Sequence, residues 1–308
     1  MDNFLKKCMR RLLSSASVTA RRDLFDALHG DMKFELRRNR LIECILRDSS
    51  SGITTKRYTN HDIIVSLTSY GRRVHEVSLT IESLMQQTMK ANRIVLWLPD
   101  DMRESPLPQA LIMQQRRGLE IKYCKDIRSY KKLIPQLKIS SDDAIITADD
   151  DIFYDYDVLE HLIAAFLEQP NVIHCSRVRK MSLDKKGSLI PYNQWAFGEK
   201  TTGMNRCFFL TGVGGVLYPP HCFDDEVFND SVFLDLCPEA DDVWFTAMAL
   251  KKGTPINKVF TRDKYGEDYI MIPHPLESGL VIRNVGQHGN DRQIKAVFSK
   301  YALYDLLK

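Results

Sequence analysis

A short apolar segment that runs directly into three carboxylates constrains the fold of this chain more than any other feature. Residues 144–148 read Ala-Ile-Ile-Thr-Ala, a pattern typical of a buried strand, and Asp149, Asp150 and Asp151 follow at once. Charged groups beside a core are disfavoured unless they reach solvent or hold a cation. In an extended backbone Asp149 and Asp151 would share one side of the strand, and two such carboxylates suit Mg²⁺ or Mn²⁺. A solvated acidic turn before a helix is the alternative interpretation.

The rest of the chain alternates between strand and helix patterns. Strand patterns occur at 63–67, 94–98, 119–124 and 144–147, and helical patterns at about 24–47, 77–85, 110–115 and 133–137. This alternation predicts βαβ units in an α/β protein, with a mainly parallel sheet flanked by helices. Ligands bind such sheets beyond the C-terminal ends of the strands, where the Asp triplet and the Thr-Ser-Tyr-Gly-Arg-Arg segment at 68–73 are expected. The glycine-rich fingerprints of dinucleotide and P-loop sites are absent.

Composition indicates a folded cytoplasmic protein. Hydrophobic and charged fractions of 44% and 27% are those of a globular chain, and 308 residues suffice for one large or two ordinary domains. No apolar stretch approaches the length of a membrane span, and the N-terminus lacks the apolar core of a secretory signal. Seven cysteines without a CxxC pair favour a reducing compartment. We expect no nucleic-acid partner.

The basic excess of the chain belongs to its N-terminus. Residues 1–57 carry thirteen Lys and Arg against seven Asp and Glu, whereas the whole chain has a net charge of only +3. Residues 4–13 place apolar side chains on one half of a helical wheel and Lys6, Lys7, Arg10 and Arg11 on the other. Such a helix either binds an anionic membrane surface peripherally or docks on its own domain or a partner subunit. We therefore divide the chain into a basic helical extension, 1–57, and a catalytic domain, 58–308.

Five motifs follow one another along the chain. They are the strand and turn at 63–73, Tyr130-Lys131-Lys132, the Asp triplet at 149–151, the glycine-rich 212–219 and the acidic 239–244. In this order they resemble the motifs of the GT-A-fold glycosyltransferases, in particular the bacterial family 2-like enzymes of capsule and lipopolysaccharide assembly, with the Asp triplet in place of the DxD motif. The resemblance covers about residues 60–290. It implies a GT-A-like domain with a nucleotide-binding half, 58–151, and an acceptor half, 152–308. The acidic pair that follows the family's second strand is matched only loosely by 98–101.

The resemblance implies a metal-dependent transfer of a sugar, with inversion, from a nucleoside-diphosphate donor to a hydroxyl group. UDP-sugars are the favoured donors, and a bacterial surface glycan or a lipid-linked precursor is the expected acceptor. Asp149 and Asp151 would bind Mn²⁺ or Mg²⁺, with His288 from a glycine-flanked loop as the third ligand. Asp242 would be the general base and Asp241 would bind the acceptor hydroxyls. An ordinary helix N-terminus also explains these last two acids.

Residues expected at the nucleotide and the donor sugar come from four segments of the chain. Lys131 or Lys132 would neutralise the departing diphosphate, and the glycines would let the backbone pass beneath the sugar. A tight turn between strands is the alternative role for these glycines. The full set is Thr68, Tyr70, Arg72, Lys131, Lys132, Asp149, Asp150, Gly214 and Gly215.

Two other functions fit parts of the sequence. A nucleotidyltransferase that makes an activated sugar shares the fold style and the metal carboxylates. It would normally carry a glycine-rich N-terminal loop with Arg and Lys, of which residues 70–73 are a poor version. A non-catalytic glycosyltransferase-like subunit of a polysaccharide assembly complex is the other, and the joint presence of Asp149, Asp151 and Asp242 argues against it.

Overall fold

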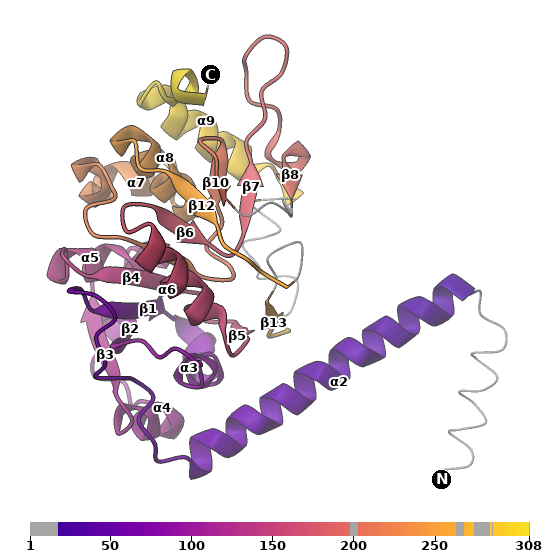
Figure 1. The fold of residues 1–308 in the computed structure, drawn as a ribbon, viewed down its shortest axis with the longest axis vertical. Coiled ribbons are helices and arrows are strands. Elements are labelled where there is room, and N and C mark those ends of the chain that lie inside the picture. Colours follow the sequence, from indigo (N-terminus) through magenta and orange to yellow (C-terminus); the bar gives the residue numbers. More distant parts are fainter. Residues whose placement is uncertain (1–17, 198–202, 263–267, 274–283, 285, 308) are drawn as a thin grey trace.

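The protein is described by a computed structural model that covers residues 18–197, 203–262, 268–273, 284 and 286–307 (Figure 1). The predicted helix at 4–13 lies outside these residues, so its membrane role stays a prediction. Within the described ranges, every helix is too short or too polar to cross a bilayer.

An eight-stranded sheet forms the centre of the molecule, with strand order β3-β2-β1-β4-β11-β6-β12-β9. The four strands β3, β2, β1 and β4 run parallel, and β11 lies antiparallel between β4 and β6. The predicted α/β class with a mainly parallel sheet is confirmed. The strands are β1 (Ile63–Thr68), β2 (Arg93–Pro99), β3 (Leu119–Cys124), β4 (Ala144–Ala148), β6 (Ile173–Cys175), β9 (Gly203–Met204), β11 (Val216–Tyr218) and β12 (Ile256–Lys258).

Two smaller sheets lie beside the central one. β5 (Ile152–Tyr154) begins directly after the Asp triplet and pairs antiparallel with β13 (Tyr269–Met271). The other small sheet has the order β10-β7-β8, with β7 (Val178–Lys180), β8 (Ala196–Phe197) and β10 (Phe208–Leu210).

Helices form at the four positions predicted from apolar spacing, about 24–47, 77–85, 110–115 and 133–137, and further helices follow in the second half of the chain. The α-helices are α2 (Val18–Arg47), α3 (Val77–Met85), α4 (Gln109–Gln115), α5 (Ile134–Ile139), α6 (Val158–Glu168), α7 (Asp230–Leu236), α8 (Asp241–Lys252) and α9 (Gly289–Lys300). Short 3-10 helices are η1 (Gly71–His75), η2 (Asp100–Met102), η3 (Arg128–Lys132), η4 (Tyr192–Gln194), η5 (Asp225–Phe228) and η8 (Leu303–Leu307).

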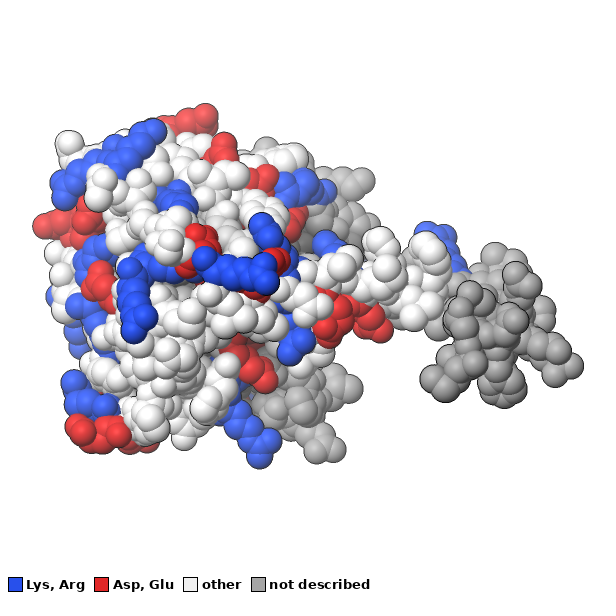
Figure 2. Space-filling view, turned by 90° about the horizontal axis from the view of Figure 1, so that it is seen from below, with Lys and Arg blue, Asp and Glu red and all other residues white. Residues whose placement is uncertain are grey.

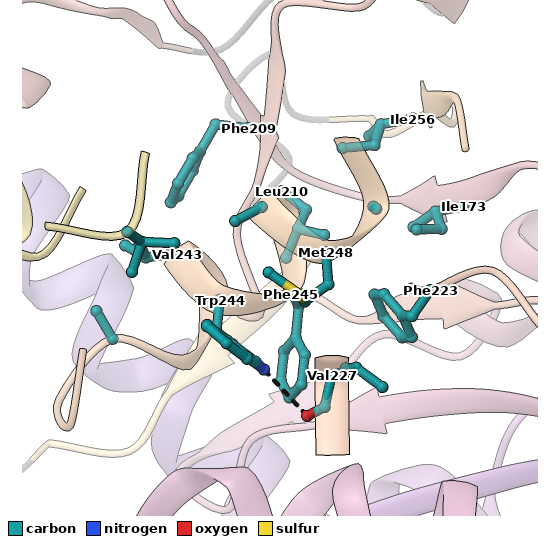
Figure 3. Close-up of a cluster of buried hydrophobic side chains, with 14 of the residues drawn as sticks. Ile173, Phe209, Leu210, Phe223, Val227, Val243, Trp244, Phe245, Met248 and Ile256 are labelled. Atoms are coloured by element: carbon teal, nitrogen blue, oxygen red, sulfur yellow. Dashed lines mark hydrogen bonds between the residues drawn. The ribbon is translucent and has the colours of Figure 1, made fainter. Parts of the chain in front are cut away.

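Apolar cores lie on both faces of the central sheet, as expected when helices cover both sides. Along β4, Ile145 belongs to one core and Ile146 to the other, because successive side chains of a strand point to opposite faces. The first core contains residues of α5, α7, α8 and α9, and the second contains residues of α3, α4 and α6. Figure 3 shows the first core around α8, where the indole Nε1 of Trp244 donates a hydrogen bond to Val227 O at 3.0 Å.

Helix α2 is attached to the body by its C-terminal half and projects from it at its N-terminal end (Figure 1). The ring of Phe34 stacks on Phe153 of β5 with centroids 5.4 Å apart, and Leu41 is buried in the same cluster. On the face shown in Figure 2, acidic and basic side chains are interspersed over the body, and the described part of the projecting helix presents mainly uncharged atoms.

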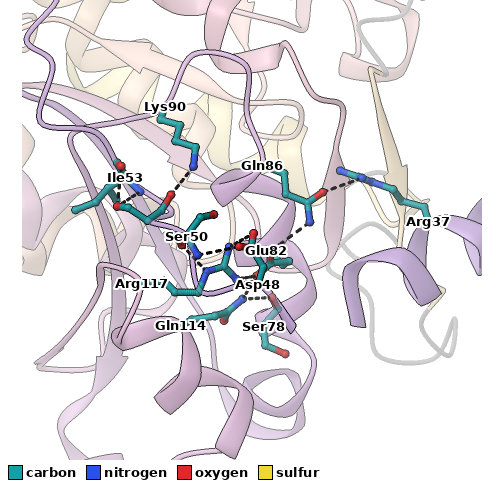
Figure 4. Close-up of polar contacts among 11 residues, drawn as sticks. Arg37, Asp48, Ser50, Ile53, Ser78, Glu82, Gln86, Lys90, Gln114 and Arg117 are labelled. Carbon is teal, nitrogen blue, oxygen red and sulfur yellow. Dashed lines mark hydrogen bonds and ion pairs between the residues drawn. The ribbon is translucent and has the colours of Figure 1, made fainter. Parts of the chain in front are cut away.

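The segment that follows α2 is fastened to the body by a buried polar network (Figure 4). The Arg117 guanidinium lies 2.8 Å from the fully buried carboxylate of Glu82 and 3.2 Å from that of Asp48, and it donates to Ser50 O. Breaking a buried ion pair by removing one partner costs about 3–5 kcal/mol. The C-terminal end of the predicted N-terminal extension, which contains Asp48 and Ser50, is therefore packed against residues 58–151.

Candidate functional site

Four segments meet at the C-terminal ends of β1 and β4 because of the strand order. β1 and β4 are parallel neighbours in register, with Leu67 opposite Ala148, so the chain leaves both strands at the same edge. β11 runs antiparallel to β4, which brings the preceding glycine-rich segment, 212–215, to this edge as well. The fourth segment is η3, which follows β3 and leads into α5. Sequence reasoning predicted the edge from the parallel sheet.

The Asp triplet forms a turn between β4 and β5 and does not continue the strand. Asp150 is buried and accepts hydrogen bonds from Ser69 Oγ at 2.6 Å and from the Arg73 guanidinium at 2.9 Å. The same guanidinium lies 3.1 Å from Asp151. The expectation for an extended backbone is therefore corrected: Asp150 and Asp151 share one cation, and Asp149 turns toward another.

That other cation is Lys132, at the end of η3. Its Nζ lies 2.9 Å from Asp149 Oδ1 and 3.0 Å from Asp241 Oδ2, and its side chain is only 7% exposed. Burial by itself would lower the pKa of Lys132, but attraction to Asp149, Asp241 and Asp242 raises it well above its usual range. The ammonium is therefore charged at neutral pH.

Asp242 lies in the first turn of α8 and faces the glycine-rich segment. The backbone N–H of Gly212 donates to both carboxylate oxygens of Asp242, at 3.0 and 3.1 Å. Burial and the neighbouring charge of Asp241 raise the pKa of Asp242 to about 7, although Lys132 and the Gly212 hydrogen bond oppose the shift. A carboxylate with a pKa near the working pH is suited to accept a proton from a hydroxyl group.

Glycines at 212, 214 and 215 are required by the geometry of the loop. A Cβ atom at position 212 would lie 2.9 Å from Lys132 Nζ and 3.0 Å from Asp242 Oδ1. Gly214 and Gly215 have φ values of +93° and +99°, which L side chains adopt only with strain. The segment therefore forms the tight turn that was expected as an alternative. This turn also brings the Gly212 backbone next to the Asp242 carboxylate.

The residues predicted to contact the nucleotide lie around the ends of β1 and η3. Tyr70 is 60% exposed, Arg72 is exposed, and Thr68 Oγ1 donates to Trp97 O at 2.8 Å. Lys131 is buried, pairs with Asp126 and places its Nζ 5.9 Å from the centre of the Tyr70 ring.

Two of the three predicted metal ligands lie at the sheet edge, each beside a basic side chain. Asp149 and Asp151 have partly exposed carboxylates at the sheet edge, and Mg²⁺ commonly uses one or two carboxylates together with substrate phosphates. His288 does not join them: its ring pairs with Asp291 at 3.0 Å and is 65% exposed. Among the described residues, which include these three, no group of three or more His, Cys, Asp or Glu side chains is arranged to hold a metal.

Three residues at the site were not assigned a role from the sequence. Ser69 and Arg73 hold Asp150, and Gly212 holds Asp242. A buried aspartate needs partners of this kind. The sequence signal was the polar run at 68–73 directly after a buried strand, but it does not indicate which of its two arginines turns inward.

Comparison with known proteins adds little to this geometry. No protein-family model matches the chain, and no curated protein has a significant match to it. Among solved structures, a CMP:2-keto-3-deoxy-manno-octonic acid synthetase complexed with CTP matches 65% of this chain and 89% of its own, with 14% identity and a TM-score of 0.34. A similarity of this size does not carry the activity of that enzyme over to this chain.

Proposed function

We propose that this protein is a glycosyltransferase that moves a sugar from a nucleoside-diphosphate donor to a hydroxyl group, with inversion. The observation that supports it best is Asp242, a carboxylate with a pKa of about 7 held by the Gly212 amide beside the Asp triplet. In this proposal Asp242 removes the proton of the attacking hydroxyl, and Asp241 helps to orient the acceptor. The favoured donor is a UDP-sugar, and the favoured acceptor is a bacterial surface glycan or its lipid-linked precursor.

A divalent cation at Asp149 and Asp151 would neutralise the negative charge that develops on the departing diphosphate. Arg73 keeps Asp150 and Asp151 oriented, and Tyr70 and Arg72 offer an exposed ring and a guanidinium next to them. The proposal places the nucleotide over the end of β1 for this reason.

A nucleotidyltransferase is the competing enzyme class, and the chemistry at Asp242 argues against one kind of it, the kind that acts on sugar phosphates. When the nucleophile is a sugar phosphate, it is already ionised and needs no base, whereas a sugar hydroxyl is a poor nucleophile until it loses its proton. A base at Asp242 therefore favours a hydroxyl over a phosphate as the nucleophile, and the reaction products decide between glycosyl transfer and nucleotidyl transfer.

The test is to incubate the full chain with Mn²⁺ and two substrate sets. One set contains UDP- and GDP-sugars, with release of UDP or GDP as the readout. The other contains nucleoside triphosphates, CTP included, with sugar 1-phosphates or free sugar acids, with release of pyrophosphate as the readout. We expect release only from the first set, and loss of that release in Asp242→Asn. Pyrophosphate release would favour the nucleotidyltransferase, and no release in either would favour a non-catalytic subunit.

A further inference from the structure

Lys132 connects two parts of the site that come from distant segments. Its ammonium is shared by Asp149, which ends β4, and by Asp241, which begins α8. Both partners lie within 3.0 Å of Nζ, and the side chain has almost no contact with solvent. The cation is therefore already committed to two carboxylates, which makes it poorly placed to act as a free ligand for a diphosphate.

The same ammonium also lies beside Asp242. A Cβ atom built on Gly212 would lie 2.9 Å from Lys132 Nζ and 3.0 Å from Asp242 Oδ1. The ammonium and the carboxylate are therefore both next to the Gly212 Cα. The Gly212 amide then fixes the orientation of the Asp242 carboxylate. Lys132, Gly212, Asp241 and Asp242 thus form one contiguous unit.

We propose that Lys132 is a positioning residue that joins the two halves of the site and holds the Asp241–Asp242 pair in its orientation toward Gly212. Two adjacent, largely buried carboxylates repel each other, and a buried cation between them and Asp149 offsets that repulsion. Without the ammonium, one carboxylate would take up a proton or turn away. The role of Asp242 as a base rests on the proposed function. The effect of the Lys132 charge on the Asp242 carboxylate does not depend on that function.

The groups around Asp242 come from several elements. The charged ones are Asp241 on α8, Lys132 on η3 and Asp149 after β4. Uncharged titratable groups within electrostatic reach are Tyr130, Cys175, Tyr192 and Tyr218, and Arg177 and Arg179 also act on Tyr192. Lys132 is the cation of this set that acts directly on Asp242.

The Gly212 amide provides a reporter that needs no substrate. We would label the full-length protein with ¹⁵N-glycine, which gives at most 15 amide signals, and follow the Gly212 signal from pH 5 to pH 9. Because its N–H donates to Asp242, the signal should move as that carboxylate titrates, and Asp242→Asn should abolish the movement and so identify the signal. The wild-type midpoint should lie near 7.

Lys132→Met is expected to raise this midpoint by about one pH unit, because an opposite charge nearby favours the ionised form. Lys132→Arg keeps the charge and should restore a midpoint close to that of the wild type. Lys138→Met, the same change at an exposed lysine of α5, should leave the midpoint unaltered. If Lys132→Met does not fold, Lys132→Gln replaces it, because the amide retains polar contacts.

A midpoint that is the same in Lys132→Met and Lys138→Met would overturn the proposal. A second measurement separates positioning from diphosphate binding: calorimetric affinity for UDP with Mn²⁺ should not fall by more than about twofold in Lys132→Met, since positioning does not require phosphate contact and Asp149 stays available to the metal. A tenfold loss of UDP affinity with an unchanged midpoint would reassign Lys132 to the nucleotide. Failure of wild-type protein to turn over nucleotide sugars would reject the proposed function and leave the midpoint test valid.

Discussion

Two acidic runs at the site consist of the same residue type but lie in different surroundings. Asp149, Asp150 and Asp151 follow β4 and face two cations, Lys132 and Arg73. Asp241 and Asp242 begin α8, where Lys132 pairs with Asp241 and a backbone amide faces Asp242. In the first run, each carboxylate lies beside a guanidinium or an ammonium group. The second contains a carboxylate whose pKa is raised to about 7, which suits proton transfer.

The largest effect that would sharpen this comparison is expected at Asp242. Asp242→Asn keeps the shape of the side chain and removes its basicity, so turnover of a nucleotide sugar should fall by about 10²–10⁴-fold. Calorimetric affinity for UDP with Mn²⁺ should stay near the wild-type value. Near-normal turnover in this variant would transfer the role of base to Asp241 or Glu239.

A smaller loss is expected at Gly212, whose missing side chain leaves room for both Lys132 and Asp242. In Gly212→Ala the new Cβ would displace the two groups, and a shift of about 1 Å at a reacting group costs up to about 10²-fold in rate. The fold should persist because the atoms displaced are side-chain ends. Gly30→Ala, where nothing lies within 4 Å, is the matched control for turnover and melting temperature.

At the first run, Asp151→Asn should weaken nucleotide binding rather than proton transfer. We expect at least about a tenfold loss of UDP affinity with Mn²⁺, since the variant removes a carboxylate that is a metal ligand in the proposed function while Asp150 retains Arg73. Titrations with Mn²⁺ and with EDTA, alongside Asp235→Asn on the exposed side of α7, measure the loss. Wild-type affinity that is equal in Mn²⁺ and in EDTA would refute the metal prediction.

The smallest of these effects is expected in the pH dependence of turnover. Because Asp242 acts as a base only without its proton, turnover should rise about tenfold per pH unit up to a plateau above about 7.

Stability should show the same titration with the opposite sign. The folded pKa of Asp242 is raised above its ordinary value of 3.8, so the folded state binds this proton more tightly than the unfolded chain does. The group therefore lowers the free energy of unfolding as pH rises from about 4 to about 7. Urea unfolding should show that Asp242→Asn gains stability relative to the wild type across this window. An equal difference at pH 4.5 and pH 8 would contradict the shift.

The sequence by itself determined the order of the elements and the edge at which the site lies. Apolar periodicity predicted β1 to β4 with their connecting helices, because each pattern reports on neighbours a few residues apart. The resemblance to GT-A-fold enzymes, and the alternative of an ordinary helix N-terminus, both place a helix start at the acidic pair, where α8 begins. From this order alone, the Asp triplet and the 68–73 segment were placed together at the C-terminal ends of the strands.

Only the tertiary structure decided which charges meet. The sequence does not show that Arg73 turns inward while Arg72 stays exposed, nor that Lys132 is buried between Asp149 and Asp241. The antiparallel insertion of β11 beside β4 brings Gly212 and α8 to the triplet across about 60 to 90 residues of chain. A buried charge is tolerated only where its partners converge, and that convergence is a property of strand order and register rather than of any local motif.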